Sequence, residues 1–251
     1  MLLLLGACHI SEQREIAIGR SQAEQVERQL ALVTDSEVAT YVQSLGERLA
    51  THTTRPNLPW RFQVVDSKDV NAFALPGGFI YVNRGLIESA DSMDELAGAL
   101  GHEIGHVVRR HSVQQLERVG GVKLGIALVC AATDACDSRS TRLAIDAGGA
   151  AWLAHNSRAA EAEADSEAIG NVIRAQIDPE GIPRLFQLLL ETRRSRPNLV
   201  TTFFASHPLE EARMEQTRAI IERYDLRAVK ELQRDEDGFQ RMRTRLIAAD
   251  R

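Results

Sequence analysis

Hydrophobic positions along the chain follow a helical spacing in some segments and alternate in others. Over residues 10–49, apolar side chains recur at intervals of three and four with charges between them, which predicts helix. Residues 34–36, Thr-Asp-Ser, interrupt this pattern and offer a cap, so we expect two helices. Residues 61–66 alternate like a strand. Residues 71–82 predict two more strands, separated by the turn signal Pro-Gly-Gly at residues 76–78.

The clearest helix is predicted over residues 92–110, where Ser92 and Glu95 have the spacing of a capping box. Four more helices are expected at residues 113–130, 159–174, 183–194 and 208–224, and a charged helix covered by solvent at 226–251. The predicted fold class is therefore α+β, mostly helical, with a small sheet. We expect three parts, namely a signal-like segment (1–8), one domain (9–225) and a helical extension (226–251).

Composition and charge exclude several classes of protein. The chain has 251 residues, of which 44% are hydrophobic and 26% charged, as in ordinary globular proteins. The net charge is −5 and the basic residues are scattered, so we expect no nucleic-acid partner. No apolar run reaches the roughly 18 to 20 residues that a membrane helix needs.

The first eight residues, Met-Leu-Leu-Leu-Leu-Gly-Ala-Cys, are apolar and end in small residues and a cysteine. They resemble the end of a bacterial lipoprotein signal peptide, although a basic segment before the apolar run is missing. This predicts lipidation of Cys8, and with it the only membrane attachment we expect. The alternative is a buried N-terminal strand.

The other two cysteines, Cys130 and Cys136, are separated by five residues. In an oxidising compartment they could form a disulfide that closes a small loop. The alternative is that they are two unrelated small hydrophobic residues.

Residues 102–106, His-Glu-Ile-Gly-His, carry the strongest chemical signal and lie within the clearest predicted helix. Residues four apart in a helix lie about 40° apart around its axis, so His102 and His106 point the same way and can bind one Zn²⁺ ion. Glu103 lies too far around the helix to be a ligand, but it can reach a water at the metal as a general base. Gly105 leaves room near the metal. The alternative is two core histidines in an ordinary helix.

The third ligand must come from elsewhere in the chain. One class of zinc peptidases has a glycine three residues, and a histidine six residues, after the second ligand. This chain has Arg109 and Ser112 at these positions, which excludes that class. His111 follows His106 by five residues, about 140° around a helix, so we expect it to face away from the metal. It would then be a surface residue or one that supports a ligand from outside.

Residues 157–165, Ser-Arg-Ala-Ala-Glu-Ala-Glu-Ala-Asp, offer a candidate third ligand. Glu161 and Asp165 share one face of the predicted helix. Glu161 could bind zinc while Asp165 accepts a hydrogen bond from the free ring nitrogen of a ligand histidine. Glu163 points to the other side and is expected to be solvated. The alternative is an acidic helix that faces solvent throughout.

With these residues identified, the sequence resembles the HtpX/Oma-type zinc peptidases, a gluzincin family that also includes the CAAX prenyl proteases. The family pairs His-Glu-x-x-His with Glu-x-x-x-Asp, which stand here as His102, Glu103, His106, Glu161 and Asp165. The resemblance implies a zincin-like metalloprotease fold, one Zn²⁺ per chain and a peptide-bond hydrolase.

Two further segments carry the resemblance. Residues 71–78, Asn-Ala-Phe-Ala-Leu-Pro-Gly-Gly, are similar to the family's edge strand, which lines the substrate cleft. This implies substrate contacts at Asn71, Ala72, Phe73 and Ala74. Ser-His-Pro at residues 206–208, followed by Arg213, implies that His207 and Arg213 approach the active site, with His207 at the zinc or the reacting carbonyl. The alternative for His207 is a residue that only precedes the next helix.

The chain lacks the membrane helices of the prenyl-protease and HtpX branches and is similar to compact, lipoprotein-type periplasmic members. The resemblance thus implies a periplasmic endopeptidase, anchored to the outer membrane, that cleaves misfolded or misassembled envelope proteins. Envelope proteins are also its expected partners. Two alternatives remain open, namely a zinc-stabilised chaperone or binding protein, and a latent protease in which His207 fills the fourth zinc position.

Overall fold

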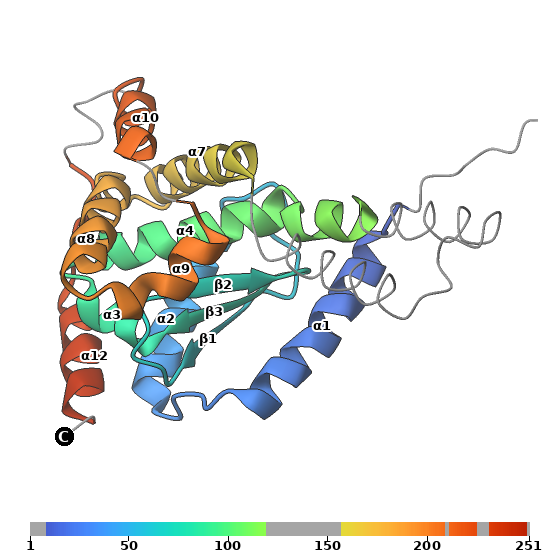
Figure 1. Cartoon of the computed structure of the whole chain (residues 1–251), viewed down its shortest axis with the longest axis horizontal. Helices are drawn as coiled ribbons and strands as arrows, with labels where there is room; N and C mark the ends of the chain where they lie inside the picture. The colour runs from blue at the N-terminus through green and yellow to red at the C-terminus, as the bar shows by residue number, and fades with distance from the viewer. Residues whose placement is uncertain (1–8, 119–156, 209–210, 225–230, 250–251) are drawn as a thin grey trace, which may run out of the picture.

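A computed structural model describes residues 9–118, 157–208, 211–224 and 231–249 (Figure 1). Helices dominate these residues and surround a small three-stranded sheet, which confirms the predicted α+β class. Cys8, Cys130 and Cys136 lie outside the described residues, so the predictions for lipidation and a disulfide remain predictions.

The N-terminal region forms two helices, as its interrupted pattern predicts. Helix α1 (Glu12–Gln29) begins after Ser11, whose hydroxyl accepts a hydrogen bond from the Arg14 N–H. Helix α2 (Ser36–Ala50) begins after Asp35, whose carboxylate accepts hydrogen bonds from the backbone N–H groups of Glu37 and Val38. These are ordinary N-caps, and they satisfy donors that have no partner within the helix.

The three strands lie where alternation predicts them. Strands β1 (Arg61–Val65) and β3 (Phe79–Asn83) are parallel, and β2 (Ala72–Leu75) pairs antiparallel with β3, so β2 is at the edge of the sheet. The turn between β2 and β3 places Gly77 and Gly78 at positive φ, which glycine adopts without steric cost.

Each face of the sheet is covered by a different set of helices. In the central strand β3, Phe79 and Tyr81 join one buried cluster on the side of α1, while Ile80 and Val82 join the larger core that contains α2 and the metal-motif helix. The edge strand divides in the same way, with Phe73 on the α1 side. Because both faces are covered, every residue of β3 is buried.

The helix that carries residues 102–106 is α4 (Met93–Val108), which follows the short helix α3 (Arg84–Ser89). All its residues are buried. Its start differs from the predicted capping box. The hydroxyl of Ser92 donates to Asp94, and Glu95 accepts a bond from the Asp91 N–H.

The remaining helices follow in the order α7 (Arg158–Arg174), α8 (Gly181–Ser195), η2 (Pro197–Val200), α9 (Thr201–Ser206), α10 (Glu211–Ile221) and α12 (Asp237–Ala248). Helices α7 and α8 match their predicted ranges within two residues. The helix predicted at 113–130 is present at residues 111–118, and its remainder lies outside the described residues. Helix α10 lies within the predicted range 208–224, and η2 and α9 were not predicted.

The expectation that the C-terminal helix is covered by solvent is wrong. In α12, Phe239, Met242 and Leu246 are buried in the main core, against α2 and α3. The error arises because these three residues are a narrow apolar stripe among many charges. Such a stripe is enough to bury one side of a helix.

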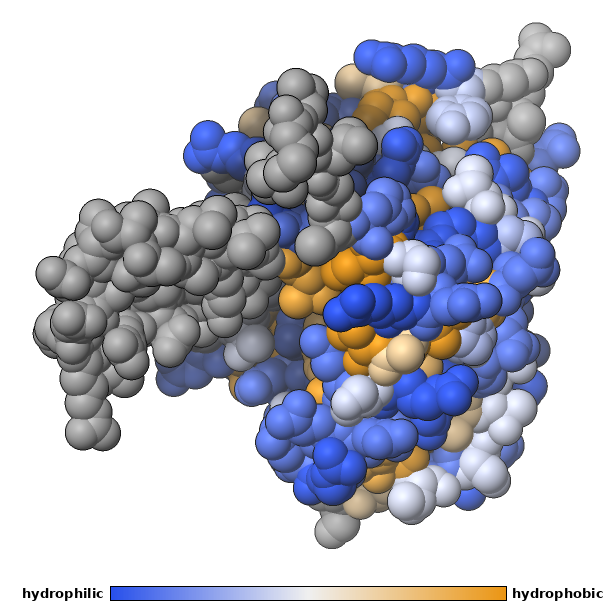
Figure 2. Space-filling model, turned by 90° about the vertical axis from the view of Figure 1, so that its right-hand side faces the viewer, coloured by the Kyte–Doolittle hydropathy of each residue, from blue (hydrophilic) through white to orange (hydrophobic). Residues whose placement is uncertain are grey.

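The described surface is mostly polar. Figure 2 shows one face of the molecule, on which hydrophilic side chains surround a band of hydrophobic ones. Among the described residues, the exposed large hydrophobic side chains are those of Leu30, Tyr224 and Ile247. In the same part of the chain, no helix has both the length and the apolar composition of a membrane span.

If α12 is part of the core, Phe239→Ala should lower the free energy of unfolding by about 3–5 kcal/mol, because it removes a fully buried ring. The matched control in the same helix is Ile247→Ala, at a residue that is 37% exposed, with an expected loss of about 1 kcal/mol or less. Equilibrium unfolding in urea measures both, and equal effects would contradict this packing.

Candidate metal centre

The centre lies where α4 packs against α7. Gly105 of α4 faces the backbone of Ala164 in α7, and a methyl group at Gly105 would lie 2.7 Å from the Ala164 carbonyl oxygen. The room that Gly105 leaves is therefore filled by α7. This close approach brings Glu161, one turn before Ala164, to the face of α4 that carries His102 and His106.

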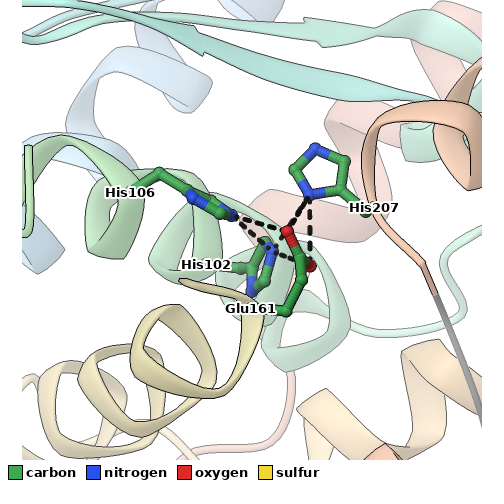
Figure 3. A group of neighbouring side chains, drawn as sticks. All are labelled: His102, His106, Glu161 and His207. Atoms are coloured by element: carbon green, nitrogen blue, oxygen red, sulfur yellow. Dashed lines mark hydrogen bonds and ion pairs between the residues drawn. The ribbon is translucent and has the colours of Figure 1, made fainter. Parts of the chain in front are cut away.

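Four buried side chains meet at this contact, His102, His106, Glu161 and His207, with one ligand atom of each within 4.8 Å of all the others (Figure 3). They come from α4, from α7 and from the residue that follows α9. The His102 and His106 Nε2 atoms are 3.0 Å apart. Each lies 3.3 Å from an oxygen of Glu161.

This spacing fits a tetrahedral metal ion. Zinc–nitrogen and zinc–oxygen distances of about 2.0–2.1 Å place neighbouring ligands of a tetrahedron about 3.4 Å apart. His207 Nδ1 lies 3.3 Å from His102 Nε2 and 3.1 Å from Glu161 Oε1, so it also stands at such a distance. The donor set of imidazole nitrogens and a carboxylate is one that zinc binds.

Asp165 and Arg213 hold this group from the side. Asp165 Oδ1 lies 2.9 Å from His102 Nδ1, the ring nitrogen that faces away from the cluster. Arg213 donates through Nε and Nη2 to the two oxygens of Asp165, at 2.9 and 2.8 Å. Its Nη1 lies 2.8 Å from Glu161 Oε2. Arg213 thus fixes both carboxylates.

The charges of the centre also favour a cation. Three carboxylates of the centre are buried, those of Glu103, Glu161 and Asp165, and the guanidinium of Arg213 contacts two of them, Glu161 and Asp165. Burial opposes the charged imidazolium, but the carboxylates of Asp165 and Glu161 raise the pKa of His102 to about 10. The carboxylates thus favour positive charge at His102, whereas burial lowers the pKa of His106 to about 3, so that His106 is neutral, as a metal ligand must be.

Glu103 and His207 lie next to each other beside the group. Both are buried, and Glu103 Oε1 lies 3.5 Å from His207 Nε2. His207 is the C-cap residue of α9, where its N–H bonds to the Phe203 carbonyl. Its ring points into the cluster (Figure 3), so the alternative in which it only precedes the next helix is wrong.

The expectation that His111 faces away is also wrong. Its ring is buried, and its Nδ1 lies 2.9 Å from His106 Nδ1. The helical-wheel argument fails because α4 ends at Val108 and Arg110 adopts a φ of +59°, so the angular spacing of one continuous helix does not extend from His106 to His111. Glu163 is half exposed, as expected, and its Oε2 lies 3.4 Å from His111 Nε2.

The predicted edge strand lies beside α4. Ala72, Phe73 and Ala74 belong to β2, whereas Asn71 immediately precedes it and is buried. The outer edge of β2 has no backbone hydrogen bond to another described residue. This edge can accept a further strand.

The sequence matches the model of peptidase family M48 over residues 36–221, a range that includes α4, α7, His207 and Arg213. The chain belongs to peptidase family M48. This confirms the resemblance seen in the sequence, and family membership implies a metal cofactor.

Relatives of this M48 chain include several named proteases. It is 28% identical over 220 residues to the beta-barrel assembly-enhancing protease of Escherichia coli, covering 83% of this chain and 44% of that protein. It is 28% identical over 174 residues to the mitochondrial metalloendopeptidase OMA1 of Schizosaccharomyces pombe, covering 69% and 50%. It is 27% identical over 188 residues to the metalloprotease YcaL of E. coli, covering 73% and 72%. The chain thus spans about half the length of the first two relatives.

Two features of this M48 site were not predicted from the sequence, namely the contact of Gly105 with α7 and the turn at Arg110 before His111. The contact of His111 with His106 agrees with one of the two roles expected for His111, that of supporting a ligand from outside. Gly105 could have indicated the helix contact, because glycine is unfavourable inside a helix and often marks a close approach of another backbone. The turn at Arg110 had no such signal, because no glycine or asparagine marks it.

Gly105→Ala should separate α4 from α7, weaken metal binding and lower the free energy of unfolding by about 1–3 kcal/mol. The control is Gly101→Ala in the same buried helix, where the new methyl group would lie 3.4 Å from the Ala168 Cβ, an ordinary contact. That control should keep metal affinity and gain helix propensity. Zinc titration and urea unfolding of both variants measure the difference, and equal zinc affinities would contradict the account.

Proposed function

We propose that this chain is a zinc-dependent metalloendopeptidase, with His102, His106 and Glu161 as metal ligands and Glu103 as general base. The observation that carries the proposal is the buried cluster of these ligand atoms at tetrahedral spacing, with Glu103 next to it on α4. Membership in peptidase family M48 supports the same reaction class.

Zinc is the metal that this donor set favours. Two imidazoles and one carboxylate, with a position left for water or substrate, are typical of catalytic zinc sites. Calcium and magnesium prefer sets made only of oxygen ligands. Asp165 supports the assignment because a zinc-bound histidine generally donates its other ring N–H to a carboxylate.

When bound, Zn²⁺ supplies Lewis acidity that polarises a peptide carbonyl and acidifies water. Glu103 removes a proton from the attacking water and returns it to the leaving amine as the C–N bond breaks. His102 and His106 keep their positions because α4 is buried along its whole length, and Arg213 holds Glu161 and Asp165 in place. The ring of His207 lies 3.5 Å from Glu103, which supports a contact of His207 with the reacting carbonyl.

The substrate would bind as an extended peptide along β2. Strand addition to an open sheet edge supplies main-chain hydrogen bonds, which favour polypeptides of many sequences. The small side chains of Ala72 and Ala74 lie on the face of β2 that belongs to the main core, which includes α4. Small residues of β2 therefore lie on the side of the strand that faces the helix with the metal ligands.

We further propose that the substrates and partners are proteins of the cell envelope, in particular misfolded or misassembled ones. The name of the E. coli relative, a beta-barrel assembly-enhancing protease, supports this setting. The lipoprotein-like residues 1–8 support a periplasmic location with an outer-membrane anchor at Cys8.

Glu103→Gln should keep one zinc per chain and lose casein cleavage by at least about a hundredfold, because a general base contributes roughly that much to the rate. Zinc content by atomic emission and the cleavage rate are measured on the same samples. Glu24→Gln, at an exposed position of α1, is the matched control and should leave both unchanged. Wild-type cleavage by the Glu103 variant would contradict the mechanism. Loss of cleavage in Glu103→Gln would also distinguish the enzyme from a zinc-stabilised binding protein, because a binding protein would keep its function after this change.

A second candidate is a latent form of the same protease. His207 Nδ1 lies near both His102 and Glu161, so it is placed to act as a fourth ligand and to fill the position that water or substrate needs. Activity would then require His207 to move.

The latent form predicts that His207→Ala raises basal casein cleavage while zinc content stays at one per chain, because three ligands remain. The same change combined with Glu103→Gln should abolish cleavage, which would assign the gain to this centre. Unchanged or lower activity of the single variant would instead favour contact of His207 with the reacting carbonyl.

A further inference from the structure

His106 makes contacts through both of its ring nitrogens. Its Nε2 faces Glu161 and His102 within the metal cluster (Figure 3). Its Nδ1 lies 2.9 Å from Nδ1 of His111, and both rings are buried. A buried imidazole nitrogen needs a partner. His111 is that partner for the side of His106 that faces away from the metal.

The protons of this pair follow from the chemistry of the ring. A neutral His106 that binds metal through Nε2 carries its proton on Nδ1, so it donates to His111. The Nδ1 atom of His111 must then accept, which leaves the proton of His111 on Nε2. That atom faces Glu163 Oε2 at 3.4 Å, and the carboxylate accepts the proton's hydrogen bond.

We propose that His111 is a positioning residue for the metal ligand His106, and that Glu163 fixes the ring form in which His111 can accept. This inference rests on the proposed function, since it requires a metal at His106 Nε2. The two ligand histidines are thus supported differently. His102 has a carboxylate directly behind it, Asp165, whereas His106 has a histidine between its ring and the carboxylate of Glu163.

The turn after α4 places His111 in this position. Arg110 adopts a left-handed conformation that is unfavourable for a residue with a side chain. Its guanidinium holds the turn, with Nε 2.9 Å from the fully buried Glu15 and Nη2 donating to the Ile10 carbonyl. Glu15 also pairs with Arg55, which donates to the carbonyl of Val107 in the last turn of α4. Helix α1 therefore supports the turn that carries His111.

The test compares His111→Leu, which has a similar volume and no acceptor, with His111→Gln, whose carbonyl can accept from His106 Nδ1. His52→Leu, at an exposed loop position, is the control. Zinc affinity is measured on the full chain by competition with a chelator. We expect a loss of about 10- to 100-fold for Leu, a loss within about threefold for Gln, and no change for the control.

Two results would overturn the proposal. Wild-type zinc affinity in His111→Leu would show that His106 needs no such partner, and equal losses in the Leu and Gln variants would show that His111 only fills space. The d–d spectrum of the Co²⁺-loaded protein gives a second readout. It should change in His111→Leu and be restored in His111→Gln, because the orientation of the ligand ring determines it.

Glu163→Ala keeps the test decisive if His111→Leu does not fold, because Glu163 is half exposed. It should weaken zinc binding by about threefold to tenfold, with Glu163→Gln restoring the affinity. Wild-type affinity in Glu163→Ala would overturn the role given to this carboxylate. If wild-type protein binds zinc but cleaves no casein, the proposed function is contradicted while the inference about His111 is not. A wild type that binds no zinc overturns both.

Discussion

Helices α4 and α7 approach so closely at Gly105 and Ala164 that no side chain fits between them, and the metal centre depends on this contact. The two histidines lie on one helix and Glu161 on the other, and the close approach of the two backbones brings their ligand atoms to 3.3 Å from one another. The burial of α4 along its whole length removes the freedom that would let the histidines separate. The metal ligands are thus held by packed helices, and β2 and His207 lie beside them.

Charge is the second constraint, and it explains the residues around the ligands. Burying Glu161 and Asp165 is unfavourable unless positive charge compensates them. Arg213 supplies part of it through bonds to both carboxylates. A metal ion and Arg213 together satisfy this demand.

The sequence predicted the parts of the fold that local patterns determine. Alternation and the Pro-Gly-Gly turn located the strands, and the spacing of His102, His106, Glu161 and Asp165 located the centre, because each signal depends on residues close in the chain. Prediction from the sequence failed where contacts between residues far apart in the chain determine the structure. The narrow apolar stripe of α12 is buried because it packs against α2 and α3, which are distant in the sequence. The turn at Arg110 is stabilised by Glu15, which belongs to another helix. No local pattern predicts the left-handed turn at Arg110 that precedes His111.

The central claim is that one metal ion lies between His102, His106 and Glu161. The most direct measurement is a crystal structure of protein loaded with Zn²⁺, with anomalous differences recorded on both sides of the zinc absorption edge. The account predicts one strong peak per chain, about 2.0–2.1 Å from Nε2 of both histidines and from a Glu161 oxygen. A loaded crystal with no peak there, or with its only peak at other residues, would contradict it.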